Sequence, residues 1–245
     1  MMIKKINSYL LLTLLFFCFA PLLCLAQKSS VDLIYQTDSY APPFYKGKSL
    51  NPNQGLVSVT AIPELITSNG QKISNNNIIY TWKKNGLVVQ AFSGKGKNTL
   101  IFRGGVPVRD SLIEVTAVST DSALSASQSI NIPNVSPKII FYENSPVYGI
   151  MFNKAISDTV NLTTDEFSVL AMPYFYSANT ATDPNLSYTW SINDQSVGNQ
   201  EQKNSFTTRV DTPGSGKAKI DLQINSKALI FQFLEKSYNI IFTKQ

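Results

Sequence analysis

The side chains that most often carry out catalysis are scarce in this sequence of 245 residues. It has no histidine, and its two cysteines, Cys18 and Cys24, both lie in an apolar N-terminal segment. Histidine-based triads, cysteine–histidine pairs and zinc sites with nitrogen and sulfur ligands therefore have no donors in the rest of the chain. The chemistries that remain are paired carboxylates, a serine–lysine dyad and a metal site built from oxygen atoms.

Carboxylates gather at one place, where Asp158, Asp165 and Glu166 lie in a polar stretch ahead of an apolar run. A glycosidase needs two carboxyl groups about 5 to 9 Å apart, one of them kept protonated by an apolar pocket, and a solvated loop offers no such pocket. Calcium takes about six to eight oxygen ligands, so a calcium site here is chemically sensible, but the spacing matches no EF-hand loop. We expect a charged loop.

Residues 93–99, Ser-Gly-Lys-Gly-Lys-Asn-Thr, superficially resemble a phosphate-binding loop. The Walker pattern requires Gly-x-x-x-x-Gly-Lys-Ser/Thr between a buried strand and a helix, whereas this stretch joins two short strands. Serine–lysine catalysis requires a buried lysine, and no lysine lies within a long apolar run. The sequence therefore predicts no catalytic residue, no cofactor and no metal, and a protein that is not an enzyme.

The elements that would hold these residues follow a period of two. In residues 57–61 and 218–224, apolar side chains alternate with polar ones, which is typical of half-buried antiparallel strands. Turn signals such as Asn85-Gly86 and Pro213-Gly214 separate these runs. Short strands with turn signals about every 8 to 12 residues predict a β-sandwich.

The strand pattern occurs twice. Tyr80-Thr81-Trp82 recurs as Tyr188-Thr189-Trp190, 108 positions later. Further matches at nearly the same offset join residues 57–63 to 167–173, Ile34-Tyr35 to Phe141-Tyr142, Phe44-Tyr45 to Met151-Phe152, and residues 113–115 to 220–222. Several landmarks in one order indicate an internal duplication.

From this duplication we predict an all-β chain with two tandem immunoglobulin-like antiparallel β-sandwiches. They would cover residues 27–133 and 138–245, with a short stiff linker at residues 134–137, which Pro133 and Pro137 bracket. Trp82 and Trp190, with Tyr80 and Tyr188, lie on the apolar face of the expected central strands. We predict that these four side chains belong to the two cores.

The run Tyr-Thr-Trp-Lys-Lys-Asn-Gly at residues 80–86 resembles strand C of an immunoglobulin-like domain and the turn that follows it. Tyr-x-Trp is also how strand C begins in domains of the polycystic-kidney-disease (PKD) type. This chain lacks the paired cysteines of antibody domains and the Asp-Phe-Gly-Asp-Gly that follows the tryptophan in PKD domains. The resemblance implies a scaffold common in bacterial surface and secreted proteins, where it serves spacing, adhesion or glycan contact.

Two segments are candidates for contact with a partner. The first is the aromatic–proline stretch with Tyr40, Phe44 and Tyr45, which either packs against an edge strand or forms a stacking platform for a sugar or peptide. It is paralleled in the second copy by Pro146, Tyr148, Met151 and Phe152. The second segment is the apolar run at residues 228–234, with Leu229, Phe231 and Phe233, where the first copy has a polar stretch. This run either covers the open end of its own sandwich or presents a patch to a partner.

The N-terminus has the layout of a secretory signal peptide: Lys4 and Lys5, an apolar run to Leu25, and the small Ala26. We expect residues 1–26 to be cleaved off and the protein to be exported to the periplasm, the cell surface or the medium. The alternatives are acylation at Cys24 and an uncleaved membrane anchor, because about 16 apolar residues fall just short of a span. No other apolar run is long enough to cross a bilayer.

The charge balance excludes a nucleic-acid role. The net charge is +5, and +3 remains when the first 26 residues are removed, spread along the chain. We expect an exported, non-enzymatic structural or adhesive binding module whose partner is another envelope protein or a glycan. The alternatives are a carbohydrate-binding accessory, a sandwich-borne enzyme, and a subunit of a surface or pilus-like assembly that docks a neighbour's strand on a long, uncharged edge strand.

Overall fold

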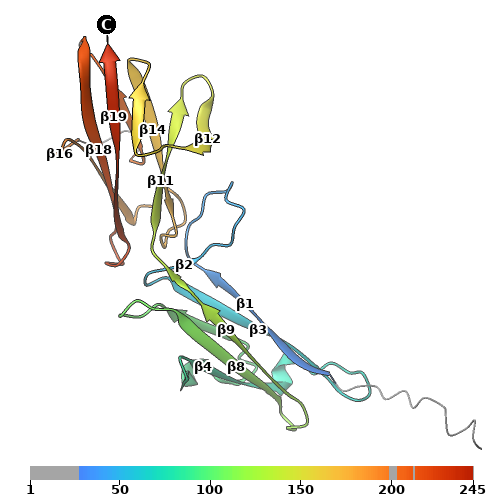
Figure 1. The fold of residues 1–245 in the computed structure, drawn as a ribbon. Coiled ribbons are helices and arrows are strands. Elements are labelled where there is room, and N and C mark those ends of the chain that lie inside the picture. Colours follow the sequence, from blue (N-terminus) through green and yellow to red (C-terminus); the bar gives the residue numbers. More distant parts are fainter. Residues whose placement is uncertain (1–27, 199–202, 212, 245) are drawn as a thin grey trace, which may run out of the picture.

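The computed structural model of the chain describes residues 28–198, 203–211 and 213–244. The signal-peptide prediction and both cysteines lie outside these residues. Two β-sandwiches follow one another along the chain and lie end to end (Figure 1). None of the helices in the described ranges has the length and apolar character needed to cross a membrane.

The first sandwich packs a three-stranded sheet, in the order β1-β3-β7, against a sheet in the order β5-β4-β8-β9 with β6 beside β4. The three-stranded sheet consists of β1 (Lys28–Thr37), β3 (Leu56–Ile66) and β7 (Thr99–Arg103). The second sheet consists of β4 (Ile78–Lys84), β5 (Leu87–Val88), β6 (Gly94–Lys95), β8 (Ser111–Ser119) and β9 (Ser125–Ile132). Two 3-10 turns, η1 (Asn75–Asn77) and η2 (Gln90–Phe92), lie in the connections.

The second sandwich has sheets in the orders β12-β11-β14-β17 and β13-β19-β18-β15-β16. The first sheet consists of β11 (Lys138–Ser145), β12 (Gly149–Ala155), β14 (Glu166–Tyr174) and β17 (Ser205–Arg209). The second consists of β13 (Thr159–Leu162), β15 (Leu186–Ile192), β16 (Gln195–Ser196), β18 (Gly214–Ser226) and β19 (Phe233–Lys244).

Each sandwich has its own apolar core. The alternation in β3 explains how the first core forms: Val57, Val59 and Ala61 are fully buried, while Ser58 and Thr60 face outward. Each buried aliphatic side chain contributes about 1.5 to 3 kcal/mol relative to an exposed one, so a sandwich of this size can fold without disulfides. The prediction of an all-β chain with two tandem immunoglobulin-like sandwiches is confirmed, while the domain limits stay a prediction.

The two sandwiches repeat one another in detail. Trp82 lies opposite Val115 and Trp190 opposite Leu222, each in the pair formed by the Tyr-Thr-Trp strand and its long neighbour. Short parallel pairs also correspond: β2 (Asn51–Pro52) pairs with β10 (Asn134–Val135), and β13 pairs with β19. In both copies a short segment after the first strand therefore forms a parallel pair: with β10, directly after β9, in the first copy and with the last strand β19 in the second.

One of the sequence matches is shifted by a residue. Leu33 lies opposite Ala61, and Phe141 lies opposite Ala171, so Leu33 rather than Ile34 is the equivalent of Phe141. Both side chains face the core, and the pleat allows only a match that preserves this inward direction. The match of Phe44-Tyr45 to Met151-Phe152 also has no counterpart in local structure, because the first pair lies in a loop and the second in β12.

Candidate functional site

The two tryptophans occupy equivalent places in the cores. Trp82 is 0% and Trp190 2% exposed, and the indole Nε1–H donates to the carbonyl of Lys97 at 2.9 Å and of Lys203 at 3.0 Å, respectively. Tyr80 is fully buried; Tyr188 is half-buried, and its hydroxyl donates to the carbonyl of Ala181. Each indole is enclosed, and its one donor is used within its own sandwich.

The aromatic–proline stretch lies between the two sandwiches. After β1 the chain leaves the first sandwich and runs beside β11 of the second (Figure 1). The ring of Phe44 lies 4.0 Å from that of Phe152 and 5.9 Å from that of Tyr142, measured between centroids. The ring of Tyr45 lies 5.8 Å from those of Tyr174 and Phe175. The stretch therefore packs within the molecule, and we call this contact, with the loop at residues 38–55, the joint.

Backbone hydrogen bonds fix the joint. The amide of Tyr40 donates to the carbonyl of Tyr176 at 2.7 Å, and the amide of Phe175 donates to the carbonyl of Tyr40 at 2.8 Å. The hydroxyl of Ser177 also donates to Asp38 Oδ1 at 3.0 Å. Hydrogen bonds from the loop after β1 therefore accompany the ring contacts of Phe44 and Tyr45. Because hydrogen bonds are directional, they fix the position of the loop on the second sandwich, which ring contacts alone would not do.

The apolar run at residues 228–234 lies at the joint as well, in the turn between β18 and β19 and in the first two residues of β19. Gln232 is completely buried: its Nε2 donates to the Asn53 carbonyl at 2.7 Å and to Ser177 Oγ at 2.9 Å, and its Oε1 accepts from the Ser177 amide at 2.8 Å. Asn53 Nδ2 donates to the carbonyl of Phe231 at 3.0 Å. The turn contacts the first sandwich through its backbone and through Gln232.

The apolar side chains of this turn are less enclosed than its backbone. Leu229 is half-buried, whereas Phe231 is 40% and Phe233 51% exposed. We expect Phe231→Ser and Phe233→Ser, singly, to lower the free energy of unfolding by about 1 kcal/mol, because about half of each residue's surface already contacts water. Urea denaturation measures this change. Leu222→Ser, at a fully buried position, is the control and should cost several times more; unfolding by either phenylalanine variant would contradict the expectation.

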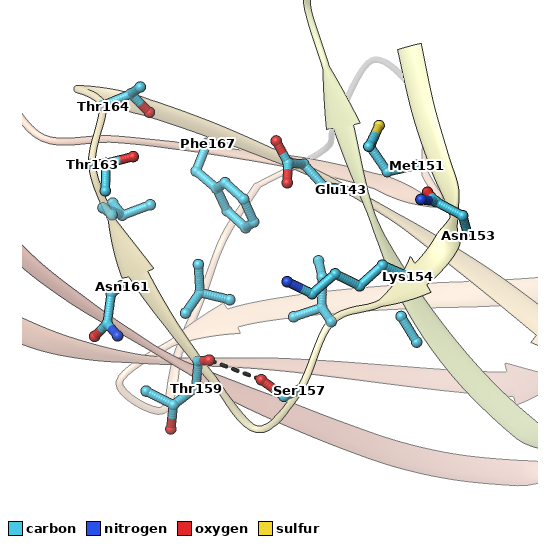
Figure 2. Close-up of a pocket in the computed structure, with 14 residues that line it drawn as sticks. Glu143, Met151, Asn153, Lys154, Ser157, Thr159, Asn161, Thr163, Thr164 and Phe167 are labelled. Atoms are coloured by element: carbon cyan, nitrogen blue, oxygen red, sulfur yellow. Dashed lines mark hydrogen bonds between the residues drawn. The ribbon is translucent and has the colours of Figure 1, made fainter. Parts of the chain in front are cut away.

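A hollow of about 470 Å³ lies on the second sandwich between β12 and residues 159–164. Figure 2 shows the side chains of Lys154, Phe167 and Glu143 in its middle, with Asn153 and Asn161 on opposite walls. Hydroxyl and amide side chains line the hollow in the same number as apolar ones, and Glu143 is the one carboxylate among the described residues that line it. The hollow can accept a polar, hydroxyl-rich ligand, but its lining lacks the pair of carboxyl groups that glycoside hydrolysis requires.

The three acidic residues singled out from the sequence, Asp158, Asp165 and Glu166, each make a different structural contact. Glu166 begins β14 and forms an ion pair with Arg209 at 2.5 Å across to β17. The carbonyl of Asp165 accepts from the amide of Val210, and that of Asp158 accepts from the amide of Asn239. Within the described ranges no three acidic, histidine or cysteine side chains come close enough together to hold a metal ion.

Residues 93–99 form a turn that supports Trp82. Ser93 Oγ accepts from the amide of Trp82 at 3.0 Å and donates to the carbonyl of Val89 at 2.9 Å, while Lys97 Nζ donates to the carbonyl of Ala91 at 2.9 Å. No helix follows, so the amide groups do not converge as in a phosphate-binding loop. The serine and lysine of this turn serve the packing of the core strand.

Strand β9 lies at the edge of its sheet and carries the sign that strand docking requires, since its sequence Ser-Ala-Ser-Gln-Ser-Ile-Asn-Ile contains no charged residue and no proline. Part of this edge is accounted for. The amide of Ser129 donates to Gln128 Oε1 at 3.0 Å, and β1 packs beside the strand. The edge is therefore not a bare row of backbone groups.

The pKa values of several side chains are shifted by burial and by nearby hydrogen bonds, not by other titratable groups gathered at one site. The amides of Asn179 and Asn185 lower the pKa of Asp183, and the Ser119 hydroxyl followed by the Ala123 amide lowers the pKa of Asp121. Burial raises the pKa of Tyr80 to about 12 and raises the pKa of Tyr176 and Tyr238 as well. These shifts are structural in origin, and none of them produces an acid or base suited to neutral pH.

We expect the free energy of unfolding to be nearly constant from about pH 6 to 8, because the chain has no histidine. Asp121 and Asp183 have lowered pKa values in the fold, so the stability that they contribute is present above the ordinary aspartate pKa and lost as the pH falls below about 4. The tyrosines have raised values, so stability is also lost above about pH 10. Denaturant titrations across this range measure the profile. A steep change near pH 7 would contradict it, and Asp183→Asn should reduce the acid loss.

The surface on which the joint forms was not predicted from the sequence. Tyr142, Leu170, Met172, Tyr174 and Phe175 gather on the outer face of β11 and β14, and each is only 5–8% exposed. A signal for it exists in the sequence: residues 169–176 are apolar or aromatic without interruption instead of alternating with polar residues, and such a run is typical of a strand covered on both faces. Gln232 had no such signal.

No protein-family model and no curated protein matches the sequence. Among solved structures, the three N-terminal domains of the bacteriophage RB49 highly immunogenic outer capsid protein align at 15% identity with a TM-score of 0.49, over 88% of this chain and 59% of that one. This chain thus spans about three fifths of that structure. The fibronectin(III)-like modules of Clostridium thermocellum CbhA align at 9% identity with a TM-score of 0.27, over 86% and 95%.

A third alignment is to domains 1–6 of the surface layer protein SbsC, at 12% identity with a TM-score of 0.37, over 89% of this chain and 29% of that one. At such identities a likeness concerns the fold alone. Strand order, register and the repeated tryptophan environment define the class of this protein from its own structure: a tandem of immunoglobulin-like sandwich modules.

Proposed function

We propose that this chain is an exported, non-enzymatic structural module of the cell envelope or the extracellular space, in which two sandwiches held at a fixed angle present a surface to a partner. The joint is the observation that carries this proposal. Flexibly linked domains need no buried Gln232 and no interlocked rings of Phe44, Phe152 and Tyr142 between them. A spacer or adhesin needs such a fixed contact between its domains, because its role is to set a distance and a direction.

The N-terminal pattern supports export, and the residue types support a role without catalysis. Residues 1–26 have the charge, apolar length and small final residue of a cleavable signal. The rest of the chain has neither imidazole nor thiol, and the hollow of Figure 2 has one carboxylate in its lining. The partner in this proposal is another envelope protein or a glycan, with no role for nucleic acid.

The test is capture on the chain from Gln27 onward, which contains every described strand. Immobilised protein is exposed to solubilised envelope of the cells that produce it, and the same preparation is assayed against polysaccharide, peptide and ester substrates. We expect a specific envelope component to be retained and no substrate to be turned over. Turnover that survives repeated purification would overturn the proposal.

Glycan binding is a second candidate, favoured by the hollow between β12 and residues 159–164. Lys154, in the middle of the hollow, and Asn161, on its wall, are both exposed and can hydrogen-bond to sugar hydroxyls. Titration with envelope glycans, followed by calorimetry, should show binding that Lys154→Ala and Asn161→Ala weaken together. Lys217→Ala, on exposed β18, is the matched control. Equal affinity in all three variants would exclude this hollow.

A further inference from the structure

A bulge in β12 shapes one wall of the hollow in the second sandwich. The ladder between β11 and β12 slips here, so that residues 151–154 lie against Glu143 alone. A bulge re-aims the side chains of the bulged strand. In a regular strand Asn153 and Lys154 would point to opposite faces, yet both line the hollow. In the part of the chain that the structure describes, the first sheet β1-β3-β7 has no strand equivalent to β12, so this wall is specific to the second copy.

Two opposite charges in this hollow have no partner in the fold. Figure 2 shows the side chains of Glu143 and Lys154 in its middle, and both residues are exposed. Within the described ranges neither side chain forms an ion pair or a hydrogen bond. Charges in a concave site are screened by less water than charges on an open surface, so they attract a ligand more strongly. A ligand with an anionic group for Lys154 and hydrogen-bond donors for Glu143 would pair both.

The rest of the lining suits a ring that has apolar faces and a polar edge. Phe167 in β14 is half-buried, so part of its ring is available to a ligand, and Met151 in β12 adds a second apolar contact. Asn161 in β13 and Thr163 directly after it are exposed and supply an amide and a hydroxyl group. Apolar contacts with a few placed polar groups are typical of sites for small ligands. A sugar ring, with C–H groups on its faces and hydroxyl groups at its edge, matches this lining.

The shape of the hollow favours a compact ligand over an extended chain. Residues 156–158 connect β12 to β13 and close one end of it (Figure 2). The amide of Ile156 donates to the Phe141 carbonyl at 2.8 Å. The carbonyl of Asp158 accepts from the Asn239 amide, also at 2.8 Å, so the connection is held to both sheets. A peptide strand added along β12 would run into this connection.

We propose that this hollow binds an N-acylated amino sugar that carries a carboxylate. The carboxylate pairs with Lys154, the N–H and neighbouring hydroxyl groups donate to Glu143, and the ring and acyl group contact Phe167. Such a ligand compensates both charges, whereas a neutral sugar leaves Lys154 unpaired and a simple anion leaves Glu143 unpaired. The proposal rests on glycan binding at this hollow, the second candidate function, and names the class of sugar.

Nuclear magnetic resonance titration of the isotope-labelled chain from Gln27 onward tests the proposal with N-acetylmuramic acid and N-acetylglucosamine. The two sugars share the ring and the acetamido group and differ in a lactyl group that carries the carboxylate. We expect the wild type to bind N-acetylmuramic acid about tenfold more tightly, the factor typical of one charge-assisted hydrogen bond. Lys154→Gln should bind the two sugars equally. Glu143→Ala should weaken the binding of N-acetylglucosamine, because an acceptor for its N–H and hydroxyl groups is lost.

The matched controls are Lys217→Gln on β18 and Glu235→Ala on β19, both at exposed positions outside the hollow. Both should keep the affinities and the preference of the wild type. Thermal melts establish that all four variants are folded.

Three results would overturn the proposal: equal wild-type affinities for the two sugars, a preference that Lys154→Gln retains, or tighter binding of the zwitterionic dipeptide glycylglycine. Equal affinities would leave glycan binding at the hollow intact and show that the class of sugar is wrong. Binding of neither sugar would also contradict the proposal. Capture of an envelope component is measured separately, so the proposed structural function does not depend on these results.

Discussion

Trp190→Ala should lower the free energy of unfolding of the second sandwich by about 3 to 5 kcal/mol while leaving the first sandwich nearly unchanged. The indole stacks on Phe206, with centroids 5.0 Å apart and planes at 18°, and it lies 6.0 Å from the ring of Phe141. Its removal leaves a cavity and an unpaired carbonyl at Lys203. A domain of this size is stable by about 5 to 15 kcal/mol, so the loss is a large fraction of the total.

The chain has two tryptophans, which makes the measurement selective. In Trp190→Ala the remaining Trp82 reports unfolding of the first sandwich by fluorescence, while circular dichroism reports both. Trp82→Ala should give the converse result. Trp190→Phe is the control, since it retains a ring and loses mainly one hydrogen bond, a cost of about 1 kcal/mol. A Trp190→Ala protein with wild-type stability and a lost ligand would show that the residue belongs to a binding site.

Gln232→Leu should let the two sandwiches move relative to one another without unfolding either of them. The side chain is completely buried at the joint, and leucine would leave the Asn53 carbonyl and the Ser177 amide unpaired. Each unpaired buried group costs about 1 to 3 kcal/mol. The joint can avoid this cost by opening, because the Asn53 carbonyl and the Ser177 amide then form hydrogen bonds with water. We expect small-angle scattering to show a broader distribution of end-to-end distances, and denaturation to resolve two transitions.

Gln195→Leu, on the exposed strand β16, is the matched control and should scatter like the wild type. Phe44→Ser should act in the same direction as Gln232→Leu, because it removes the ring 4.0 Å from Phe152. If Gln232→Leu keeps the wild-type distance distribution, the joint does not set the angle between the sandwiches, and the spacer proposal loses its main support.

Local pattern was enough to predict an all-β chain with two tandem sandwiches. The alternation of Val57, Val59 and Ala61 with polar residues depends only on the pleat of one strand, and the repeated Tyr-Thr-Trp marks the same central strand in both copies. Each of these features depends on only a few neighbouring residues. The one-residue error in matching the first strands of the two copies therefore did not affect the prediction of the fold.

The joint could not be predicted in the same way. Its specificity comes from pairs far apart in sequence, such as Gln232 with Asn53 and Ser177 with Asp38, and nothing near Gln232 distinguishes it from a surface glutamine. The aromatic–proline stretch was recognisable as unusual, but whether its rings face a partner or the neighbouring sandwich depends on the direction in which the loop leaves β1. The unbroken apolar and aromatic run at residues 169–176 shows that the sequence carries this information for the surface that receives the loop.

The short parallel pairs have a consequence for a protein under tension. When the two ends of the chain are pulled apart, β13 is drawn toward the N-terminus and β19 toward the C-terminus, so the ladder from Thr159 to Leu162 is loaded in shear. Bonds loaded this way must break together rather than one at a time. A parallel pair of this kind lies near the C-terminal end of each copy, β2 with β10 in the first and β13 with β19 in the second. Each pair resists the start of unfolding when the molecule is stretched.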